Sequence, residues 1–353
     1  MTGTEKAGET GSVMRNPHFC NIEERVIHAL SLLHERHNRG TMNAFTNRRI
    51  IIRKAKSLEV KKKKELREIS IDGCRKIGEG AHGVVYQTAP DMLVKVYREG
   101  VSLDDIHREQ ALCRRAFVKG IPTAIPFGVV RVGGHYGTMF ELLNAKSASD
   151  YIAEFPERLD WFIEKSVELM KQVHAIEAES GELPDMKQRT FVWLERIRTK
   201  LSSVHYEKLR QILESVPDRR TLLHADFHLK NIMVCGDELM LIDMDTLCTG
   251  DPIFELATAY NSYREFPSIN PAAAAFLGID VKTAERICDR TFELYLEGNK
   301  TPSIQDTVHT ARLLGCIRII EYMDRNARPE SKQCIEHCCR DIEMLLESSP
   351  AVR

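Results

Sequence analysis

Apolar positions along this chain follow two different periods, and the change between them falls near residue 145. Between residues 69 and 98, short runs rich in β-branched residues, such as "GVVYQT" and "MLVKVY", are separated by Gly and by "APD". This alternation of short runs and turn residues predicts β-strands. After residue 145, apolar residues recur at three- and four-residue spacing, which predicts helices. We therefore expect a small β-rich part followed by a larger helical part.

The helical part contains several long amphipathic segments. One face of "LDWFIEKSVELMKQVHAI" carries Leu159, Ile163, Val167, Met170 and His174. We expect His174 to pack in the core rather than to bind a ligand, because its neighbours on that face are apolar. Further helices are predicted at 191–201, 205–216, 253–263, 281–298, 304–326 and 331–348.

One cysteine cluster, "CIEHCCR", stands out among the ten cysteines of the chain. Its members Cys334, His337, Cys338 and Cys339 could form a metal site. A structural zinc site usually draws on two separated ligand pairs, however, and the sequence shows no second pair. We instead expect a helix whose buried face carries Cys334 and Cys338 one turn apart.

Residues 1–68 are expected to form an extension. Its start is rich in Gly, Thr and Glu, which is typical of disorder, and "IEERVIHALSLLHERH" then has helical spacing. Residues 48–67 carry ten Lys or Arg against two Glu. A basic run of this kind can bind nucleic acid or an anionic surface, but no aromatic residues interleave for base stacking. A solvated basic helix or linker is the favoured interpretation.

Composition and charge exclude several classes of protein. Hydrophobic residues make up 43% and charged residues 29%, and the formal net charge is -1. This is an ordinary globular balance, with no overall field to attract nucleic acid or a membrane. No apolar run approaches the roughly 18 residues of a membrane helix, and the N-terminus lacks the hydrophobic core of a signal peptide. We expect a cytoplasmic protein, and its oligomeric state cannot be inferred from the sequence.

The most unusual segment is "TLLHADFHLKNIMVCGDELMLIDMDT", where polar residues stand among apolar ones. Two short strands, "NIMVC" and "ELMLID", flank "GD", which is a two-residue hairpin signal. A chain reversal at Gly236 brings Asn231 beside residues 242 and 243, and the paired oxygen ligands of Asn231 and Asp243 suit Mg²⁺, which also binds substrate phosphates. Asp226 lies in the loop before the hairpin, where it can accept a hydroxyl proton.

A second group of candidate residues lies in "KIGEGAHGVVYQTAPDMLVKVY". It contains Gly78, Gly80 and Gly83 in a G-x-G-x-x-G pattern. Dinucleotide-binding folds share this pattern, but there the glycines open a helix, whereas here a strand follows them. Glycines between two strands let backbone N–H groups approach phosphates. Lys95 on the next strand is expected to be a phosphate ligand rather than a solvated edge residue.

A helix is also expected after residue 102, because Ser102 and Asp105 match a capping box. Glu109 then lies in the middle of that helix. It either pairs with Lys95 or faces solvent, and the sequence leaves both interpretations open.

The motifs resemble those of the protein-kinase-like superfamily, in its aminoglycoside/choline phosphotransferase branch. "HADFHLKN" is similar to the H-G-D-x-H-x-x-N loop of that branch, and "LIDMDTLCTGDPIFELA" to its I-D-x-x-x-x-x-x-G-D-P-x-x-D-L-A segment. The resemblance covers about residues 69–330 and looks closest to a bacterial set of kinase-like proteins. It implies a two-lobed α+β fold, with a small β-rich N-lobe over 69–144 and a larger helical C-lobe over 145–353.

The resemblance also implies residue roles. Asp226 would be the catalytic base, Asn231 and Asp243 would hold Mg²⁺, and ATP would supply the phosphoryl group. The hinge between lobes would read adenine through Glu141 and Leu143. The other nucleotide-binding residues that the resemblance implies are Gly78, Gly80, Gly83, Val85, Lys95 and Glu109. The catalytic-loop residues that it implies are His224 and His228.

Three departures from the family pattern are visible. Ala225 replaces the usual Gly, which by its size is a small change. Met244 and Asp245 stand where protein kinases have Phe-Gly, and Glu255 replaces an Asp and keeps its charge.

The expected acceptor of the γ-phosphate is a hydroxyl of a small molecule, such as a sugar, amino sugar or amino alcohol. Only eleven residues separate Asp243 from Glu255, which leaves little room for the peptide-docking segment of a protein kinase. A protein kinase and a regulatory nucleotide-binding pseudokinase remain as alternatives. Asp245 could contact a substrate cation or support the metal, whereas Asp251, followed by Pro252, is better explained as a helix N-cap.

Overall fold

The computed structural model of the chain describes residues 66–80, 83–298 and 302–348. By its internal contacts the chain divides into two units, Met1–Lys63 and Lys64–Arg353, and every described residue belongs to the second. The helix predicted in the extension and nearly all of the basic segment lie outside the described residues.

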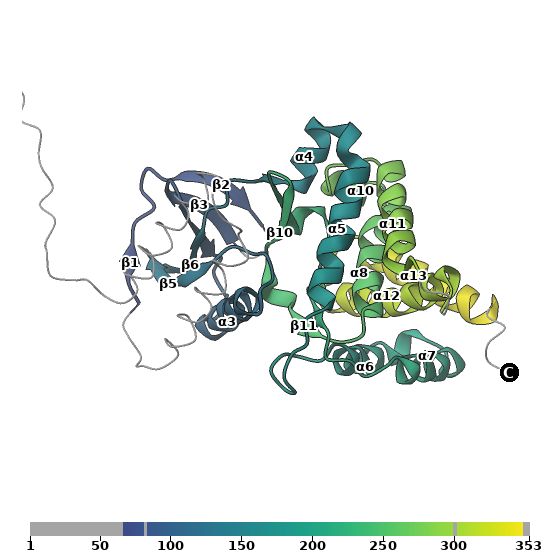
Figure 1. Cartoon of the computed structure of the whole chain (residues 1–353). Helices are drawn as coiled ribbons and strands as arrows, with labels where there is room; N and C mark the ends of the chain where they lie inside the picture. The colour runs from purple at the N-terminus through teal and green to yellow at the C-terminus, as the bar shows by residue number, and fades with distance from the viewer. Residues whose placement is uncertain (1–65, 81–82, 299–301, 349–353) are drawn as a thin grey trace, which may run out of the picture. The chain divides into compact units, whose positions relative to one another are not determined.

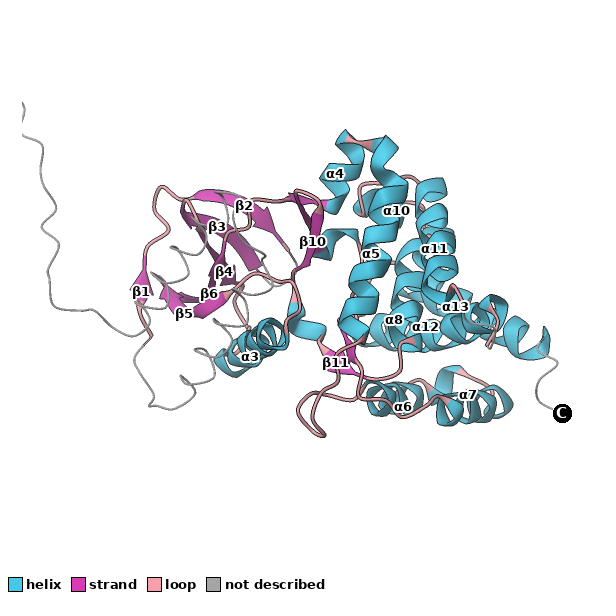
Figure 2. Ribbon diagram, in the orientation of Figure 1, coloured by secondary structure: helices cyan, strands magenta, loops and turns pink. Residues whose placement is uncertain are grey.

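The first part of the described chain forms a six-stranded sheet (Figures 1 and 2). Its strands are β1 (Glu68–Ile69), β2 (Arg75–Glu79), β3 (Gly83–Ala89), β4 (Met92–Tyr97), β5 (Pro126–Val132) and β6 (His135–Glu141), in the spatial order β1-β5-β6-β4-β3-β2. Neighbouring strands are antiparallel except for β1 and β5. The sheet begins one residue before the strand-rich region predicted from the sequence, because Glu68 pairs with Arg131.

Helix α3 (Leu103–Lys119) connects β4 to β5, as its sequence predicts. The Ser102 hydroxyl caps it by accepting the N–H of Asp105 at 3.1 Å. The predicted capping box is only half formed, because the Asp105 carboxylate accepts the Ser102 hydroxyl at 2.6 Å. Gly120 ends the helix in the left-handed conformation that glycine adopts without strain.

The rest of the described chain is mainly helical, as its hydrophobic period predicts (Figure 2). The helices are α4 (Ala148–Glu154), α5 (Leu159–His174), α6 (Met186–Arg196), α7 (Ser203–Ser215), α8 (Ile253–Tyr260), α9 (Phe266–Ile269), α10 (Ala272–Phe276), α11 (Val281–Leu296), α12 (Ile304–Asn326) and α13 (Ser331–Ser348). The last two match their predicted ranges. The mixed α+β fold expected from the sequence is therefore confirmed.

Five short strands accompany these helices. They are β7 (Lys146–Ser147), β8 (Leu222–Leu223), β9 (Ile232–Cys235), β10 (Glu238–Leu241) and β11 (Cys248–Thr249). Three of them form the sheet β10-β9-β7, and the other two pair as β11-β8. These strands and the loops between them carry the polar segment that the sequence analysis singled out.

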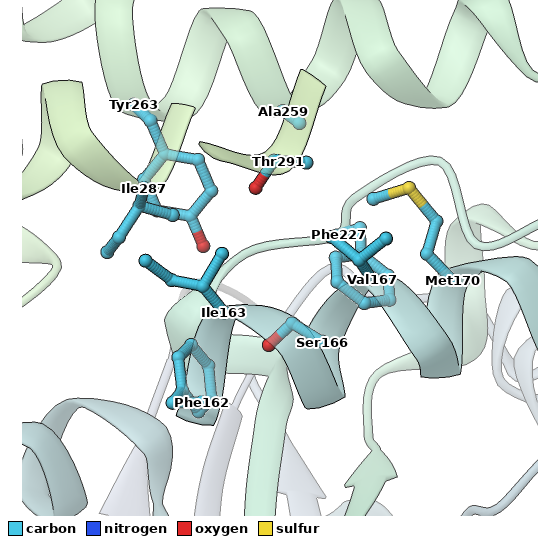
Figure 3. Close-up of a pocket in the computed structure, with 10 residues that line it drawn as sticks. All are labelled: Phe162, Ile163, Ser166, Val167, Met170, Phe227, Ala259, Tyr263, Ile287 and Thr291. Atoms are coloured by element: carbon cyan, nitrogen blue, oxygen red, sulfur yellow. The ribbon is translucent and has the colours of Figure 1, made fainter. Parts of the chain in front are cut away.

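The core of the helical part is closely packed. A cavity of about 10 Å³ lies among α5, α8, α11 and the loop that contains Phe227 (Figure 3). The Ser166 hydroxyl is one of the few polar groups lining this cavity, and it has no hydrogen-bond partner among the described residues. A volume of this size holds about one water molecule. The cavity is therefore too small to bind a substrate.

Two further predictions on the helical part can be checked. His174 packs in the core, where its Nδ1 lies 2.7 Å from the hydroxyl of Tyr295. Cys334 and Cys338 lie on the buried face of α13, as predicted. Within the described part of the chain, no helix is both long and apolar enough to cross a membrane.

Candidate active site

The predicted hairpin forms and its open end is closed by a backbone hydrogen bond. Strands β9 and β10 pair with Cys235 opposite Glu238, so the chain reverses at Gly236 and the residue that follows it. The N–H of Ile242 donates to the carbonyl of Asn231 at 2.9 Å. Asn231 therefore lies beside the residue that precedes Asp243, as the sequence analysis expected.

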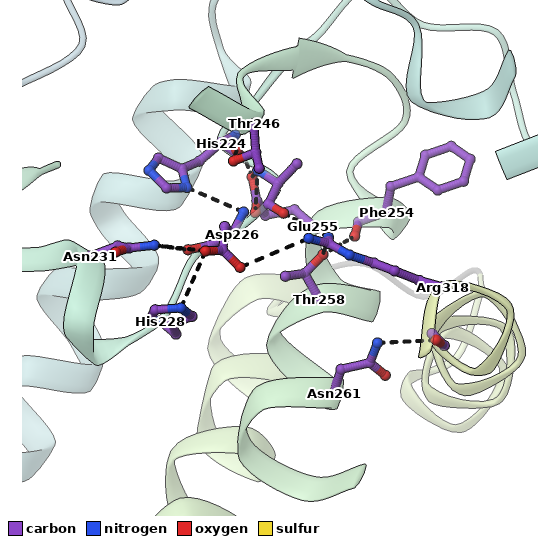
Figure 4. A network of polar contacts seen from close by, with 12 residues as sticks. His224, Asp226, His228, Asn231, Thr246, Phe254, Glu255, Thr258, Asn261 and Arg318 are labelled. Carbon is purple, nitrogen blue, oxygen red and sulfur yellow. Dashed lines mark hydrogen bonds and ion pairs between the residues drawn. The ribbon is translucent and has the colours of Figure 1, made fainter. Parts of the chain in front are cut away.

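Asp226 lies in the loop before this hairpin and contacts two residues that the sequence analysis assigned to the site (Figure 4). The side-chain nitrogen of Asn231 donates to both the carbonyl and the Oδ2 of Asp226, each at 2.9 Å. His228 Nε2 lies 3.3 Å from the same Oδ2. Because both hydrogen bonds use the nitrogen of the Asn231 amide, its oxygen points away from Asp226 and is left for another ligand.

His224 holds the loop in place through both ring nitrogens. Its Nδ1 accepts the backbone N–H of Asp226 at 3.2 Å, so the ring proton of neutral His224 is on Nε2. That Nε2 lies 3.0 Å from the carbonyl of Ile242, to which it donates. The imidazole thus joins the Asp226 loop to the end of β10, which is the positioning role that the resemblance implies.

The surroundings of Asp226 keep its carboxylate ionised. Burial by itself would raise the pKa of Asp226, but the contact with His228 and the nearby Arg318 guanidinium outweigh burial. The pKa of Asp226 therefore lies well below its usual range. An ionised carboxylate at this position can accept a proton throughout the physiological pH range.

Lys95, on β4, connects the sheet to the helical part. Its ammonium group lies 2.7 Å from Glu109 Oε1 on α3 and 3.5 Å from Asp243 Oδ1. Of the two interpretations left open for Glu109, the structure therefore contains the ion pair with Lys95. Burial would lower the pKa of Lys95, but the two carboxylates outweigh it and raise that pKa, so Lys95 stays charged.

Two carboxylates crowd together at the end of the hairpin. Burial, followed by the negative charge of Asp243, raises the pKa of Asp245 to about 7. A divalent cation at this point would relieve the repulsion between them. The amide oxygen of Asn231 and the carboxylate of Asp243 are the hard oxygen ligands that Mg²⁺ prefers, so the residues present fit this ion.

The three glycines of the G-x-G-x-x-G pattern differ in why glycine is needed. A Cβ on Gly83 would lie 2.3 Å from the carbonyl oxygen of Val96, so the pairing of β3 with β4 requires glycine there. A Cβ on Gly80 would meet no atom within 4 Å, which leaves space above that backbone. Gly78 pairs with Val85 across β2 and β3. Sheet packing therefore accounts for Gly83 without any phosphate.

The remaining nucleotide-binding candidates lie on the same sheet or directly after it. Val85 and Lys95 are paired across β3 and β4, so their side chains share one face of the sheet. Glu141 is the last residue of β6, and its Oε2 accepts the N–H of Ile125 at 3.3 Å. Leu143 lies in the link between β6 and β7. Their assignment to adenine recognition remains a prediction.

Glu255 has a larger part in the site than the sequence analysis gave it. It is fully buried on α8, and its carboxylate accepts the backbone N–H groups of His224 and Ala225 at 2.7 and 2.9 Å (Figure 4). Burial would raise the pKa of Glu255, but the nearby His174 and His224 side chains and the N–H of Ala225 lower it. His174 Nε2 lies 3.7 Å from Glu255 Oε2.

Arg318 is a site residue that the sequence analysis missed. From α12 it donates to the carbonyl of Ala225 at 2.7 Å and to the hydroxyl of Thr258 at 2.8 Å. Its other terminal nitrogen lies 3.9 Å from Asp226 Oδ1 (Figure 4). An arginine inside the apolar run "LLGCIRIIEY" was the available signal, because a charged residue on the buried face of a helix needs a partner.

Asp251 acts as a helix cap, as expected, but the start of the helix differs by one residue. The Asp251 carboxylate accepts the N–H of Ile253 at 2.9 Å and pairs with Arg219 at 2.8 Å. Helix α8 begins at Ile253, so Pro252 takes the capping position rather than the first helical position. With its charge already paired, Asp251 is poorly suited to recognise a substrate cation.

Comparisons with known proteins bear on the family and the fold of the chain. The model of the phosphotransferase enzyme family matches residues 73–286. A choline/ethanolamine kinase family protein from Mesorhizobium loti is 13% identical, with a TM-score of 0.52 over 78% of this chain and 88% of that one. The ADP-bound aminoglycoside phosphotransferase APH(2'')-Ib is 16% identical, with a TM-score of 0.52 over 83% of this chain and 98% of that one.

A GDP complex of a mutant aminoglycoside 2'-phosphotransferase is 12% identical, with a TM-score of 0.52 over 86% of this chain and 98% of that one. At such identities these likenesses show the fold alone, which is that of the kinase-like neighbours. A comparison with curated proteins found no match.

Proposed function

The chain belongs to the phosphotransferase enzyme family and is a phosphotransferase with an alcohol group as acceptor, and we propose that it transfers the γ-phosphate of ATP, with Mg²⁺, to a small molecule. The observation that carries this proposal is the convergence of two groups of residues at the open end of the hairpin. One group contains Asp226 and Asn231, and the other contains Lys95, Glu109 and Asp243.

In the proposed reaction, each group has a separate task. Asn231 and Asp243 would hold Mg²⁺, which neutralises charge on the phosphates when bound. Lys95, kept in place by Glu109, would contact the phosphates as a fixed positive charge. Asp226 would accept the proton of the acceptor hydroxyl as the oxygen attacks phosphorus. These tasks consist mainly of positioning and charge neutralisation, which is what phosphoryl transfer requires.

We propose His228 as the residue that orients the acceptor hydroxyl beside Asp226. Its Nε2 lies 3.3 Å from the Asp226 carboxylate. Its Nδ1 is buried and has no hydrogen-bond partner among the described residues, so it is available to a bound molecule.

For the acceptor, we propose a sugar, amino sugar or amino alcohol. Helix α8 begins only ten residues after Asp243, which supports a small acceptor because little chain remains to dock a peptide. Asp245, next to the proposed metal ligand Asp243, would favour a substrate that carries a positive charge.

The test is turnover of γ-phosphate-labelled ATP with Mg²⁺ and a filtered extract of bacterial small molecules. We expect the wild type to make a labelled small product and Asp226→Asn to make at least about 100-fold less, because general-base catalysis contributes 10²–10⁴-fold. Asp226→Asn should still bind nucleotide. Asp237→Asn, at the exposed tip of the hairpin, is the matched control and should keep full activity.

Each other result has a distinct meaning. Label on a protein rather than on a small molecule would support the protein-kinase alternative. Nucleotide binding without any turnover would support the pseudokinase alternative. Equal turnover by the wild type and Asp226→Asn would contradict the assignment of the catalytic base.

A further inference from the structure

A second group of metal-ligating side chains lies in the helical part, and the phosphotransferase site does not use it. Glu265, Cys316 and Cys338 place one carboxylate oxygen and two sulfur atoms within 4.8 Å of one another. All three residues are buried, with exposed fractions of 2%, 0% and 0%. They come from three segments that are distant in the sequence, namely the π-helical turn 261–265, α12 and α13.

The Glu265 carboxylate lies beside the Asp341 carboxyl group, but one of its two oxygens is left without a hydrogen bond. Its Oε1 is buried and makes no hydrogen bond to any described residue. His337 Nε2 lies only 3.1 Å from it, so the distance suits a hydrogen bond but the direction of the ring N–H does not. A buried carboxylate oxygen without a partner is costly and points to a ligand that the protein atoms do not supply.

The backbone is arranged to bring Glu265 to the cysteines. Helix α8 passes into a π-helical turn at 261–265, and such turns often occur at functional sites because they redirect side chains. On the same turn, the Asn261 amide donates to the carbonyl of Gly315 at 3.1 Å. A Cβ on Gly315 would lie 2.2 Å from the Asn261 side chain, so only glycine permits this approach beside Cys316.

We propose that Glu265, Cys316 and Cys338 bind a zinc ion. Two thiolates and a carboxylate are ligands that zinc accepts, and their softness disfavours Mg²⁺ and Ca²⁺. With metal–ligand bonds of about 2.0–2.3 Å, neighbouring ligands of a tetrahedral ion lie roughly 3.3–3.8 Å apart. That spacing is within the 4.8 Å that bounds the three ligand atoms. Both thiols release their protons to solvent when the ion binds.

A water molecule would complete the tetrahedral coordination. His337 Nε2 lies 3.1 Å from Glu265 Oε1, but it groups with Glu265 and Asp341 and not with the two cysteines. Two thiolates and a carboxylate leave a formal charge of -1 on a divalent ion, and the Arg312–Asp341 ion pair beside the cluster is neutral overall.

The proposed site differs from the metal interpretation weighed in the sequence analysis. That interpretation of "CIEHCCR" was set aside because no second ligand pair was evident. The proposed ligands come partly from other segments and include Cys338 rather than Cys334. Burial on one face of α13 accounts for both cysteines, as predicted, and the proposed zinc would give Cys338 a second role.

The test is the zinc content of the full chain, purified from zinc-supplemented cells and measured by elemental analysis after gel filtration. We expect one zinc per chain in the wild type. Cys316→Ser, Cys338→Ser and Glu265→Gln should each weaken zinc binding roughly tenfold or more, since even supporting residues contribute 10–100-fold. Cys339→Ser is the matched control on the same helix and should keep its zinc.

A cobalt spectrum keeps the test decisive if a serine variant fails to fold. Co²⁺ bound to the folded wild type should show a thiolate-to-cobalt charge-transfer band, which Cys339→Ser retains. Absence of that band, or equal zinc in the wild type and Cys338→Ser, would overturn the proposal. Lys95→Met should hold as much zinc as the wild type, so failure of the metal site and failure of the proposed phosphotransfer are distinguishable.

Discussion

Ala225 adopts a backbone conformation that its own side chain disfavours. Its φ is +63°, in the left-handed region, and the residue is fully buried between His224 and Asp226. The conformation persists because its N–H donates to Glu255 and its carbonyl accepts from Arg318. The family's usual Gly is replaced here by Ala225. This replacement has a backbone cost that the small difference in residue size did not suggest, because only glycine adopts this φ freely.

Ala225→Gly should stabilise the protein. The left-handed conformation costs an L-residue about 1 kcal/mol, and glycine removes that cost. Urea unfolding should show an increase of about that size in the free energy of unfolding. Ala116→Gly, in the regular helix α3, is the matched control and should lose about 0.5–1 kcal/mol. A loss of the same size in Ala225→Gly would mean that the backbone is not strained there.

At the scale of elements, Glu255 connects α8 to the loop that carries Asp226. Residues 224–228 lie outside regular secondary structure, between β8 and a short 3-10 helix at Leu229–Asn231, so their N–H groups need other acceptors. The Glu255 carboxylate is the acceptor for those of His224 and Ala225. The Glu255 carboxylate on α8 thus determines the conformation of the loop that carries Asp226.

Glu255→Gln should change the dependence of stability on pH. The pKa of Glu255 is lower in the folded than in the unfolded chain, where 4.5 is usual. Its carboxylate therefore stabilises the fold above about pH 4.5, and that contribution is lost as the pH falls further. At pH 7 the variant should lose about 2 kcal/mol, because a hydrogen bond to a charged group is replaced.

The check is urea unfolding of the wild type and Glu255→Gln at several pH values between 7 and 3. The difference in unfolding free energy between the two proteins should shrink as the pH falls below about 4.5. Glu164→Gln, on the exposed face of α5, serves as the control and should follow the wild type. A difference that stays constant over this range would show that Glu255 does not ionise differently on folding.

At the scale of the whole molecule, the candidate site depends on two parts of the chain. Lys95 comes from the sheet and Asp243 from the hairpin of the helical part, 148 residues later. A nucleotide that contacts both should stabilise the folded protein as a whole. At 100 times its dissociation constant, such a ligand adds about 2.7 kcal/mol to the free energy of unfolding.

Mg²⁺ and ATP together should therefore raise the melting temperature, by on the order of 5 °C for a domain of this size. Lys95→Met and Asp243→Asn should each reduce this rise, because each removes a charge proposed to contact the phosphates or the metal. Lys165→Met, on α5, should show the full rise. An unchanged rise in Lys95→Met would place the nucleotide elsewhere on the molecule.

Features that depend on residues close in the sequence were predicted, whereas contacts between residues far apart in the sequence were not. The hairpin at Gly236, the helix 304–326 and the buried face of α13 were predicted because each depends on residues that are close in the sequence. The role of Arg318 was not predicted. Its partners are the Ala225 carbonyl and the Thr258 hydroxyl, and neither leaves a signal near Arg318 in the sequence.

The sequence by itself determined the α+β class, the order of a β-rich part before a helical part, and the types of side chain available for chemistry. Hydrophobic period and turn residues act over a few positions, so they are readable without coordinates. Only the tertiary structure decided which of those side chains meet. It pairs Lys95 with Glu109, hydrogen-bonds Glu255 to the loop that carries Asp226, and brings the sulfur of Cys316 close to that of Cys338. These contacts depend on packing between distant segments, which local patterns do not encode.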